Sequence, residues 1–457
     1  MATATMDPVR LPPGSRIPKL IQTTAFLMSS HDMFAALARR YGSDVVRVNL
    51  PRNNDAVVIC DPLLAKDLFS TGTDLVERAP SGAGAIGAVF GPGSTFSLAS
   101  DEHRARRKLL TPPFRGKRMR GYERIIEEEV LREIAHWKDG REFSAFEPML
   151  RITLGAILRA VFGADGPALK ELREIVPPMV TLGSMLAVCP PVVHKDLGPW
   201  SPWGRFLRAR RRFDAIIASL ISEARADPAI DERADVLALL LQARYEDGEG
   251  ISDQHIADEL LTLLASGHET TAASLAWALE RLSRHPELLS ELTEEADAGG
   301  STLRQATIWE VQRTRPVLDG TTRRTKTRIR LGEWVLPEGT NIIISIKLAH
   351  ESEDDFTEAH SFNPYRYLET GIKPAAWIPF GGGVNRCVGA AFANMELDVV
   401  LRTLLREFRF ATTDAPDEKA RWRGLATVPA RGARSMVYRR SDGVPEGVGS
   451  LSAAGQR

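Results

Sequence analysis

The chain has 457 residues, and its 59 basic and 59 acidic side chains leave no formal net charge. Apolar residues make up 43% and charged residues 26%, which is ordinary for a globular protein with a large core, and the lack of a basic excess argues against a nucleic-acid-binding role. Three widely separated cysteines argue against a disulfide framework and favour a reducing compartment.

The start of the chain carries neither a targeting signal nor an anchor that we can recognise. Residues 1–10 are expected to be disordered, and Leu11-Pro-Pro-Gly14 forms a stiff entry into the folded part. The opening residues lack the apolar stretch of a signal peptide, and no run approaches the ~18–20 apolar residues of a membrane span. We therefore expect a cytoplasmic protein without a transmembrane anchor.

The first predicted elements are a pair of strands, residues 45–50 and 56–60, the first alternating and the second a short apolar run. Residues 78–97 are rich in Gly, Ala and Ser and read as a long loop, a feature that is often functional. A segment rich in Pro and Trp leads into an amphipathic helix over residues 206–221.

Helices dominate the rest of the pattern. A long buried helix is predicted from Ser252, a plausible N-cap, to His285, where Pro286 stops it. A shorter helix follows over 303–314, a strand over 340–346 and a last long helix over 389–408. The tail, 441–457, is expected to be disordered. The fold class is mainly α with a minor β part.

The segment Phe380-Gly-Gly-Gly-Val-Asn-Arg-Cys-Val-Gly389 is the most informative stretch of the chain. Three consecutive glycines let the backbone approach a flat ligand closely. Cys387 directly precedes a helix, whose N-terminal N–H groups and dipole stabilise a thiolate. Taken alone, an isolated cysteine beside a glycine turn is more often a buried structural residue.

The spacing Phe380-x-x-Gly-x-x-x-Cys387-x-Gly389 resembles the heme-binding signature of cytochromes P-450. The following GAAFANMELDVVL resembles the helix after it in bacterial members. The resemblance implies a triangular helical domain with a small β-rich region, a single catalytic domain over residues 11–440, and heme b ligated at its iron by Cys387. Phe380 and Gly381 would then belong to the heme-binding segment. One departure is Asn385, where the family usually has Arg or His.

The other motifs of that family occur here in the expected order. Glu310-x-x-Arg313 and the Arg of Phe362-x-Pro-x-Arg366 resemble the family's buried salt-bridged network, a structural rather than a catalytic element. Alone, Glu-x-x-Arg is more often an exposed helix pair worth ~0.3–0.5 kcal/mol.

Ser266-Gly-His-Glu-Thr-Thr271, in the middle of the long helix, resembles the family's oxygen-activation motif. The resemblance implies that Glu269 and Thr270 relay protons, and that Gly267, costly in a helix, leaves a groove for dioxygen. The alternative is a helix kink with threonines bonded back to the helix.

His103-x-x-x-Arg107 resembles the family's helix that binds the heme propionates, and Arg323 matches a third propionate ligand. A solvated basic helix face is the alternative for His103 and Arg107.

These resemblances imply a heme-thiolate monooxygenase that inserts one oxygen atom from dioxygen into a lipophilic small molecule. Ferredoxin and ferredoxin reductase are the expected electron donors, because no flavin or reductase domain fits in the remaining sequence. The alternatives are a heme-thiolate peroxygenase and a heme-binding sensor without turnover. We expect the redox partner to dock on four basic residues, and the substrate pocket to be shaped by three segments. The basic residues are Arg106, Lys108, Lys117 and Arg118, and the segments are residues 82–89, the loop with Trp200 and Trp203, and Val317–Leu318.

Overall fold

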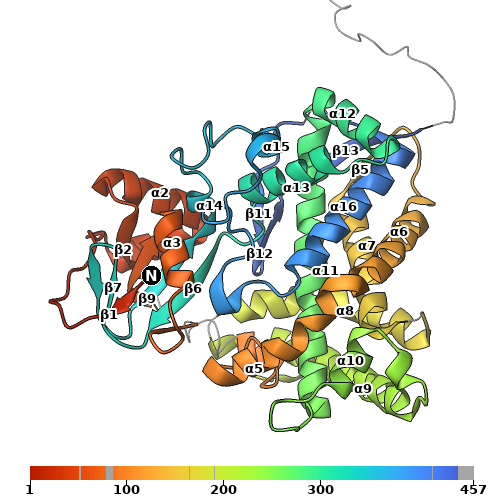
Figure 1. Ribbon diagram of the computed structural model, residues 1–457, viewed down its shortest axis with the longest axis horizontal. Coiled ribbons are helices and arrows are strands. Elements are labelled where there is room, and N and C mark those ends of the chain that lie inside the picture. The colour runs from red at the N-terminus through yellow and green to blue at the C-terminus, as the bar shows by residue number, and fades with distance from the viewer. Residues whose placement is uncertain (51–52, 79–85, 164, 190, 414, 441–457) are drawn as a thin grey trace, which may run out of the picture.

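Two regions of different character lie side by side in the computed structural model, a small β-rich region and a larger helical one (Figure 1). The structure describes residues 1–50, 53–78, 86–163, 165–189, 191–413 and 415–440. The predicted class, mainly α with a minor β part, is confirmed. In the part of the chain that the structure describes, no helix is long and apolar enough to cross a membrane.

A five-stranded sheet forms the centre of the β-rich region. Its strand order is β2 (Val45–Leu50), β3 (Asn53–Ile59), β9 (Asn341–Ser345), β6 (Gly320–Thr325) and β4 (Val76–Glu77), and only the β3–β9 pair is parallel. The predicted strand pair and the predicted strand over 340–346 are therefore confirmed. The helices of this region are α1 (Lys19–Met28), α2 (Ser30–Tyr41), α3 (Pro62–Phe69) and α14 (Ile346–Ala349).

The N-terminal residues differ from the prediction that they are disordered. β1 (Thr3–Ala4) pairs antiparallel with β7 (Ile329–Leu331), which pairs in turn with β8 (Trp334–Leu336). Ala2 is buried, and its N–H donates to the hydroxyl of Thr71 at 3.2 Å. Ladder bonds and this burial hold the segment, whereas a two-residue strand is too short to leave a periodic pattern in the sequence.

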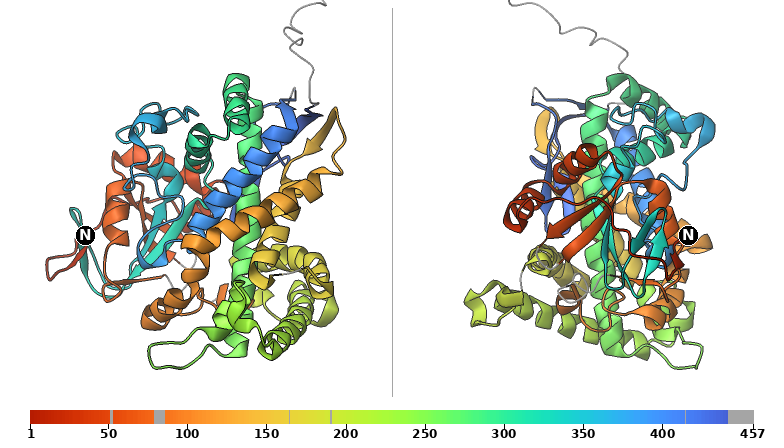
Figure 2. Two further views of the ribbon diagram at one scale, coloured as in Figure 1. Left: turned by 45° about the vertical axis from the view of Figure 1, so that its right-hand side comes forward. Right: turned by 90° about the vertical axis from the view of Figure 1, so that its left-hand side faces the viewer.

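The helical region is built around α11 (Asp253–Ser283), which runs through it from one end to the other (Figure 2). Ser252 is its N-cap and accepts a hydrogen bond from the N–H of His255, as predicted. The other helices are α5 (Ser100–Leu110), α6 (Met119–Ile134), α7 (Phe146–Phe162), α8 (Pro167–Val188), α9 (Pro202–Ala226), α10 (Val236–Gln242), α12 (Pro286–Asp297), α13 (Thr302–Thr314), α15 (Arg366–Thr370) and α16 (Ala390–Glu407).

Two of the neighbours of α11, α7 and α16, matter for the site described below. α7 packs along one side of α11, and α16, the helix that follows Cys387, packs against it from another direction. One core cluster of buried residues extends from Val89 to Val437. That cluster fills the helical region, whereas the β-rich region has separate clusters. The single domain expected over residues 11–440 stays a prediction. Two small sheets complete the region, with orders β10 (Phe408–Ala411), β13 (Arg434–Arg439), β5 (Arg141–Ser144) and β11 (Ala420–Arg423), β12 (Ala426–Pro429).

α8 carries two prolines, Pro177 and Pro178, inside its 22 residues. Neither can donate a backbone hydrogen bond, and a proline ring in a helix interior crowds the carbonyl one turn earlier. Of the long loop predicted over 78–97, residues 86–90 are helical, and residues 79–85 lie outside the described part, as does the tail 441–457.

Candidate active site

The segment before α16 forms a tight turn that ends at Cys387. The N–H of Cys387 donates to the carbonyl of Phe380 at 3.0 Å and closes the turn. Gly381 and Gly383 both have φ of +65°, in the left-handed region that favours glycine. A Cβ on Gly382 would overlap the ring of Phe69. The three glycines are thus required by the backbone and by its close approach to α3.

Cys387 lies just before α16, beside the positively charged Arg107 and Arg386. Its side chain is accessible to solvent, yet burial is the largest influence on its pKa and raises it. A backbone hydrogen bond from Gly389 and the positive charges of Arg107 and Arg386 oppose that rise. The thiol therefore needs a further positive charge to ionise, and a metal ion bound by its sulfur would provide one.

The three residues expected to bind propionates lie close together. α5 places His103 and Arg107 one turn apart, and Arg323 enters from β6. Arg107 donates to the carbonyl of Arg386 at 2.6 Å, and Arg323 to that of Gly382 at 3.2 Å. Burial, reinforced by neighbouring guanidinium groups, lowers the pKa of His103 to about 4, so this imidazole is neutral at pH 7. His103 and Arg323 are buried, and so the alternative of a solvated basic face is wrong for His103.

Arg106, expected on a docking surface, is buried instead. Its guanidinium donates to the carbonyl of Gly93 at 2.7 Å, to the hydroxyl of Tyr245 at 2.7 Å and to the carboxylate of Glu259 at 3.2 Å. Only 2% of the residue is exposed, because this network ties α5 to α11. The prediction that Arg106 meets a redox partner is wrong, while the side chain of Lys117 lies outside the description.

The middle of α11 is accessible at Ser266, although most of the helix is buried. Thr270, one turn on, is partly exposed, and its hydroxyl donates to the carbonyl of Ser266 at 2.6 Å, the back-bonding that the alternative interpretation predicts. Glu269 is buried, and its carboxylate accepts a hydrogen bond from Arg423 of β11 at 2.7 Å. Burial raises the pKa of Glu269, and the charge of Arg423 opposes this rise only in part.

Gly267 lies where α11 packs against α7. A Cβ there would lie 3.1 Å from the side chain of Ile157 on α7. The missing side chain therefore allows the two helices to pack closely, and the predicted dioxygen groove stays a prediction.

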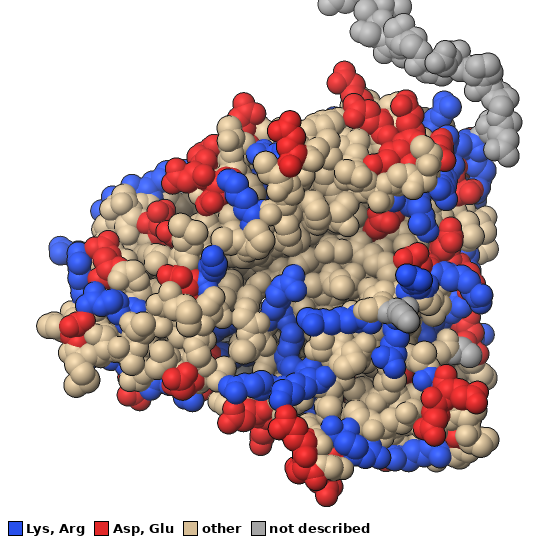
Figure 3. Space-filling model, viewed as in Figure 1, with Lys and Arg blue, Asp and Glu red and all other residues tan. Residues whose placement is uncertain are grey.

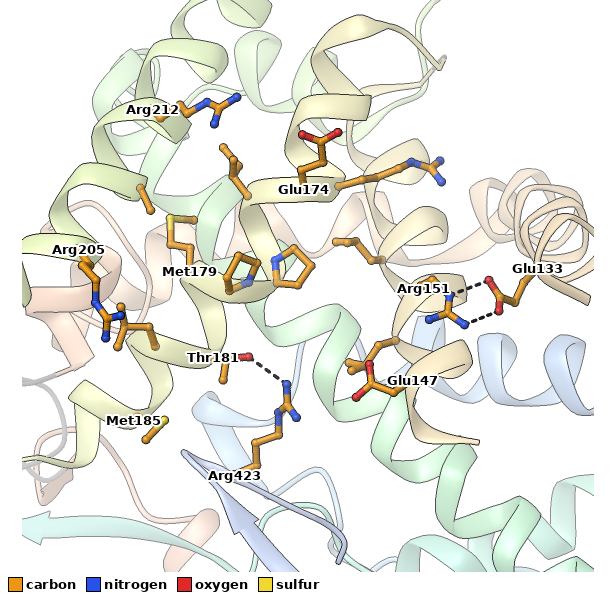
Figure 4. A pocket seen from close by; sticks show the side chains of 18 of the residues that line it. Glu133, Glu147, Arg151, Glu174, Met179, Thr181, Met185, Arg205, Arg212 and Arg423 are labelled. Carbon is orange, nitrogen blue, oxygen red and sulfur yellow. Dashed lines mark hydrogen bonds and ion pairs between the residues drawn. The ribbon is translucent and has the colours of Figure 1, made fainter. Parts of the chain in front are cut away.

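A pocket of about 1130 Å³ lies between α6, α7, α8 and α9, with Arg423 of β11 on its wall (Figure 4). Arg423 and Thr181 lie together on its wall, where Arg423 donates to the hydroxyl of Thr181 at 3.1 Å while also holding Glu269. Arg423 thus connects the buried carboxylate to a solvent-open pocket. No local sequence pattern predicts this contact, because 154 residues separate Arg423 from its partner.

Glu310, Arg313 and Arg366 form the buried network that the motifs predict. Arg313 donates to both carboxylate oxygens of Glu310, at 2.7 and 2.8 Å, and Arg366 donates to one of them at 3.3 Å. The remaining donors of Arg313 reach the carbonyls of residues 350, 359 and 361. No part of this network contacts the Cys387 thiol in the described structure, which fits a structural role.

The segments expected to shape a substrate pocket differ in how exposed they are. Trp200 is 92% exposed and faces outward, so it is not a pocket wall, whereas Trp203 is buried against Phe206. Leu318 is 42% exposed, and the carbonyl of Val317 accepts from the N–H of Thr427. Residues 82–85 of the Gly-rich segment lie outside the described residues.

Glu396 on α16 is a buried carboxyl that the sequence did not single out. Neither of its oxygens has a hydrogen-bond partner within the described part of the chain. Burial raises the pKa of Glu396 well above its ordinary value, and the neighbouring hydroxyl of Thr271 opposes this rise. Burial therefore favours the neutral form of this carboxyl, which lies on a helix that packs against α11.

This protonation predicts how stability depends on pH. The carboxyl ionises near pH 4.5 in the unfolded chain but stays neutral in the folded one, so folding stability is lost as the pH rises above 4.5 toward the folded pKa. Glu396→Gln removes that loss. Relative to the parent, the variant should gain stability as the pH rises above 4.5, by at most about 1.4 kcal/mol per pH unit, in chemical denaturation. Exposed Glu294→Gln is the control, and an equal pH dependence in the two variants would contradict the assignment.

The site fits a heme. It offers a thiol at the start of a helix, a glycine turn against which a flat group can lie, and cations whose hydrogen bonds end on neutral oxygens. Two carboxylates are the counter-charge that such a cluster lacks. On the face of the molecule shown in Figure 3, Lys and Arg side chains gather around a hollow near the middle.

Comparison with known proteins agrees with this geometry. The model of the cytochrome P450 family matches residues 11–433. Cytochrome P450 138 of Mycobacterium bovis is 51% identical over 434 residues, which cover 94% of this chain and 97% of that protein. Cytochrome P450 137 of Mycobacterium tuberculosis is 36% identical over 93% of this chain and 90% of its own length.

Among solved structures, retinoic acid-bound CYP120A1 from a cyanobacterium has the same fold. It superposes with a TM-score of 0.83 at 21% identity, and the match covers 95% of this chain and all of that one. The heme-thiolate site, the fold and the relatives lead to one conclusion. The chain belongs to the cytochrome P450 family, the heme-thiolate monooxygenases whose heme iron is ligated by a cysteine.

Proposed function

We propose that this enzyme inserts one atom of dioxygen into a lipophilic small molecule, with electrons from a separate ferredoxin and its reductase, in the cytoplasm. The observation that carries the proposal is the pair Glu269–Thr270 at the accessible middle of α11. An enzyme that activates dioxygen needs protons delivered one at a time, and a carboxyl with a hydroxyl beside it can deliver them. A peroxide-driven enzyme or a sensor has less use for such a pair.

The heme, when bound, supplies the oxidising chemistry through its thiolate-ligated iron. In this proposal Cys387 holds the iron, while His103, Arg107 and Arg323 hold the propionates. Arg423 holds the Glu269 carboxylate at the wall of the open pocket, so that solvent can exchange protons with it. Burial keeps the pKa of Glu269 raised, which favours proton transfer near neutral pH.

The test supplies NADPH, a ferredoxin and its reductase under ¹⁸O₂. Lipophilic compounds would first be screened for the heme absorption changes that mark binding near the iron. Mass spectrometry of the product should show one ¹⁸O atom per molecule, formed in proportion to NADPH consumed. Product that forms from hydrogen peroxide alone, without ¹⁸O, would indicate the peroxygenase instead. Binding without any product under both conditions would indicate the sensor.

Ferredoxin docking is predicted on exposed basic residues near the Cys387 segment. Arg115, Arg118 and Arg386 are exposed, and the charges of Arg115 and Arg386 both act on Arg107 beside the thiol. Charge reversal at Arg118 and Arg386 should slow reduction by an acidic ferredoxin at low salt and flatten its dependence on ionic strength. Exposed Arg211→Glu on α9 is the control. Equal effects of all three reversals would contradict docking at this face.

A further inference from the structure

Arg78, which no motif singles out, reaches the Cys387 segment from the residues after β4. Its guanidinium lies 3.5 Å from the amide oxygen of Asn385 and donates to the carbonyls of Phe96 at 3.2 Å and Thr95 at 3.4 Å. The Phe96 ring also packs beneath it, with its centroid 5.4 Å from the guanidinium carbon. The cation is therefore fixed from two sides and held against the segment that precedes the thiol.

Three guanidinium groups from three different elements converge on residues 382–386. Arg78 bonds to Asn385, Arg107 of α5 to the carbonyl of Arg386, and Arg323 of β6 to that of Gly382. In the described part of the chain, the hydrogen bonds of these three groups all end on neutral oxygens. The cluster thus has three positive charges and no carboxylate bonded to it.

The electrostatics agree with this proximity. Burial lowers the pKa of Arg78, and the charge of Arg107 lowers it further. Burial and then Arg78 lower the pKa of Arg323 to about 10, which leaves it charged at neutral pH. Three partly desolvated cations that repel one another are costly to hold together unless an anion lies between them. Two carboxylates on one ligand would supply that counter-charge.

We propose that Arg78 is a propionate-binding residue of the heme, and that it supplies the positive charge for which position 385 has only an asparagine. An arginine at 385 would place a second guanidinium against Arg78, and like charges at that distance repel. Asn385 instead offers its amide oxygen to Arg78 and holds it in place. In this proposal the positive charge that the family usually places at position 385 is supplied here by Arg78. Exposed Arg386, next to Asn385, is then free to face solvent.

The proposal rests on the heme and not on the substrate or the redox partner, so it can fail while the monooxygenase assignment stands. The test compares Arg78→Gln, Asn385→Arg and the double variant as holoproteins. The rate of heme transfer to excess apomyoglobin, followed by absorbance, should rise about ten- to a hundredfold in Arg78→Gln, because a charge-assisted hydrogen bond is lost. In the double variant the restored charge should bring the rate back to within about threefold of the parent.

The reduction potential of the holoprotein is the second measurement. Loss of a cation near the propionates should make the potential more negative in Arg78→Gln, and the double variant should recover it. Arg104→Gln is the matched control, since Arg104 lies exposed on α5 and pairs with Asp101. Its heme transfer rate and its potential should equal those of the parent.

Two results would overturn the proposal. In the first, Arg78→Gln transfers heme at the parent's rate with an unchanged potential. In the second, Arg78→Gln loses heme quickly but Asn385→Arg does not rescue it. That result would mean that Arg78 serves only to hold the backbone at Thr95 and Phe96.

Discussion

Cys387→Ala is expected to abolish the red-shifted Soret band of the reduced, CO-bound protein. That band requires a thiolate on the iron, and Cys387 is the cysteine on the glycine turn before α16. Three guanidinium groups bond to the residues just before this cysteine. Without the sulfur the iron has no soft, electron-donating axial ligand, so turnover should fall to the background of free heme.

The other two cysteines provide the controls for this experiment. Cys60 is buried in the β-rich region, and burial raises the pKa of its thiol to about 12. Cys60→Ala and Cys189→Ala should both keep the band and the activity. If Cys387→Ala kept the band, the assignment of the axial ligand would be wrong.

Glu269→Gln and Thr270→Ala should each leave heme bound but divert electrons from product to peroxide or water. Proton delivery by a positioned side chain contributes about 10²–10⁴-fold, and we expect a loss of product formation in that range. Binding of heme should not change, because the two side chains bond to Ser266 and Arg423 and not to the residues expected to hold the heme. The ratio of product formed to NADPH consumed is the measurement. Unchanged coupling in both variants would remove the pair from the mechanism.

The variant Arg423→Gln tests whether Glu269 acts in proton delivery or only in packing. Arg423→Gln removes the charge that opposes the burial of Glu269, so the pKa of that carboxyl should rise further. The pH profile of coupling should shift upward in Arg423→Gln and lose its dependence on this group in Glu269→Gln. Thr181→Val removes the other contact of Arg423 on the pocket wall and should have a smaller effect.

Much of this site was predictable from local sequence. The limits of α11 follow from Ser252 and Pro286, which cap and stop a helix wherever the chain lies in space. The Cys387 turn and the Glu310–Arg313 pair are encoded within ten and four residues respectively, as a glycine run and an i, i+3 spacing. Such short patterns can be recognised in the sequence because their geometry depends only on residues close to them in the chain.

Contacts between distant segments could not be predicted in this way. Arg78 lies at the end of a stretch with no periodic hydrophobic pattern. Arg423 bonds to Glu269, which lies 154 residues away in the sequence. Arg106 shows the opposite error, since a charged residue on a charge-rich helix reads as solvated, whereas Glu259 lies opposite it in the core. Glu396 reads as the polar face of an amphipathic helix, because nothing in its own segment shows that α11 covers it.

The two prolines of α8 interrupt the backbone hydrogen bonds of this helix near its middle. The carbonyls one turn before Pro177 and Pro178 receive no amide from them, so the hydrogen-bond ladder is interrupted at the wall of the open pocket. The half of α8 after this break carries Thr181, which bonds to Arg423, and Ser184, which packs against Gly424. If α8 bends at the prolines, Thr181 and Ser184 would move together with this half of the helix. Because Arg423 bonds to both Thr181 and Glu269, such bending would change how far solvent reaches the Glu269 carboxylate. Motions of this kind occur in microseconds to milliseconds.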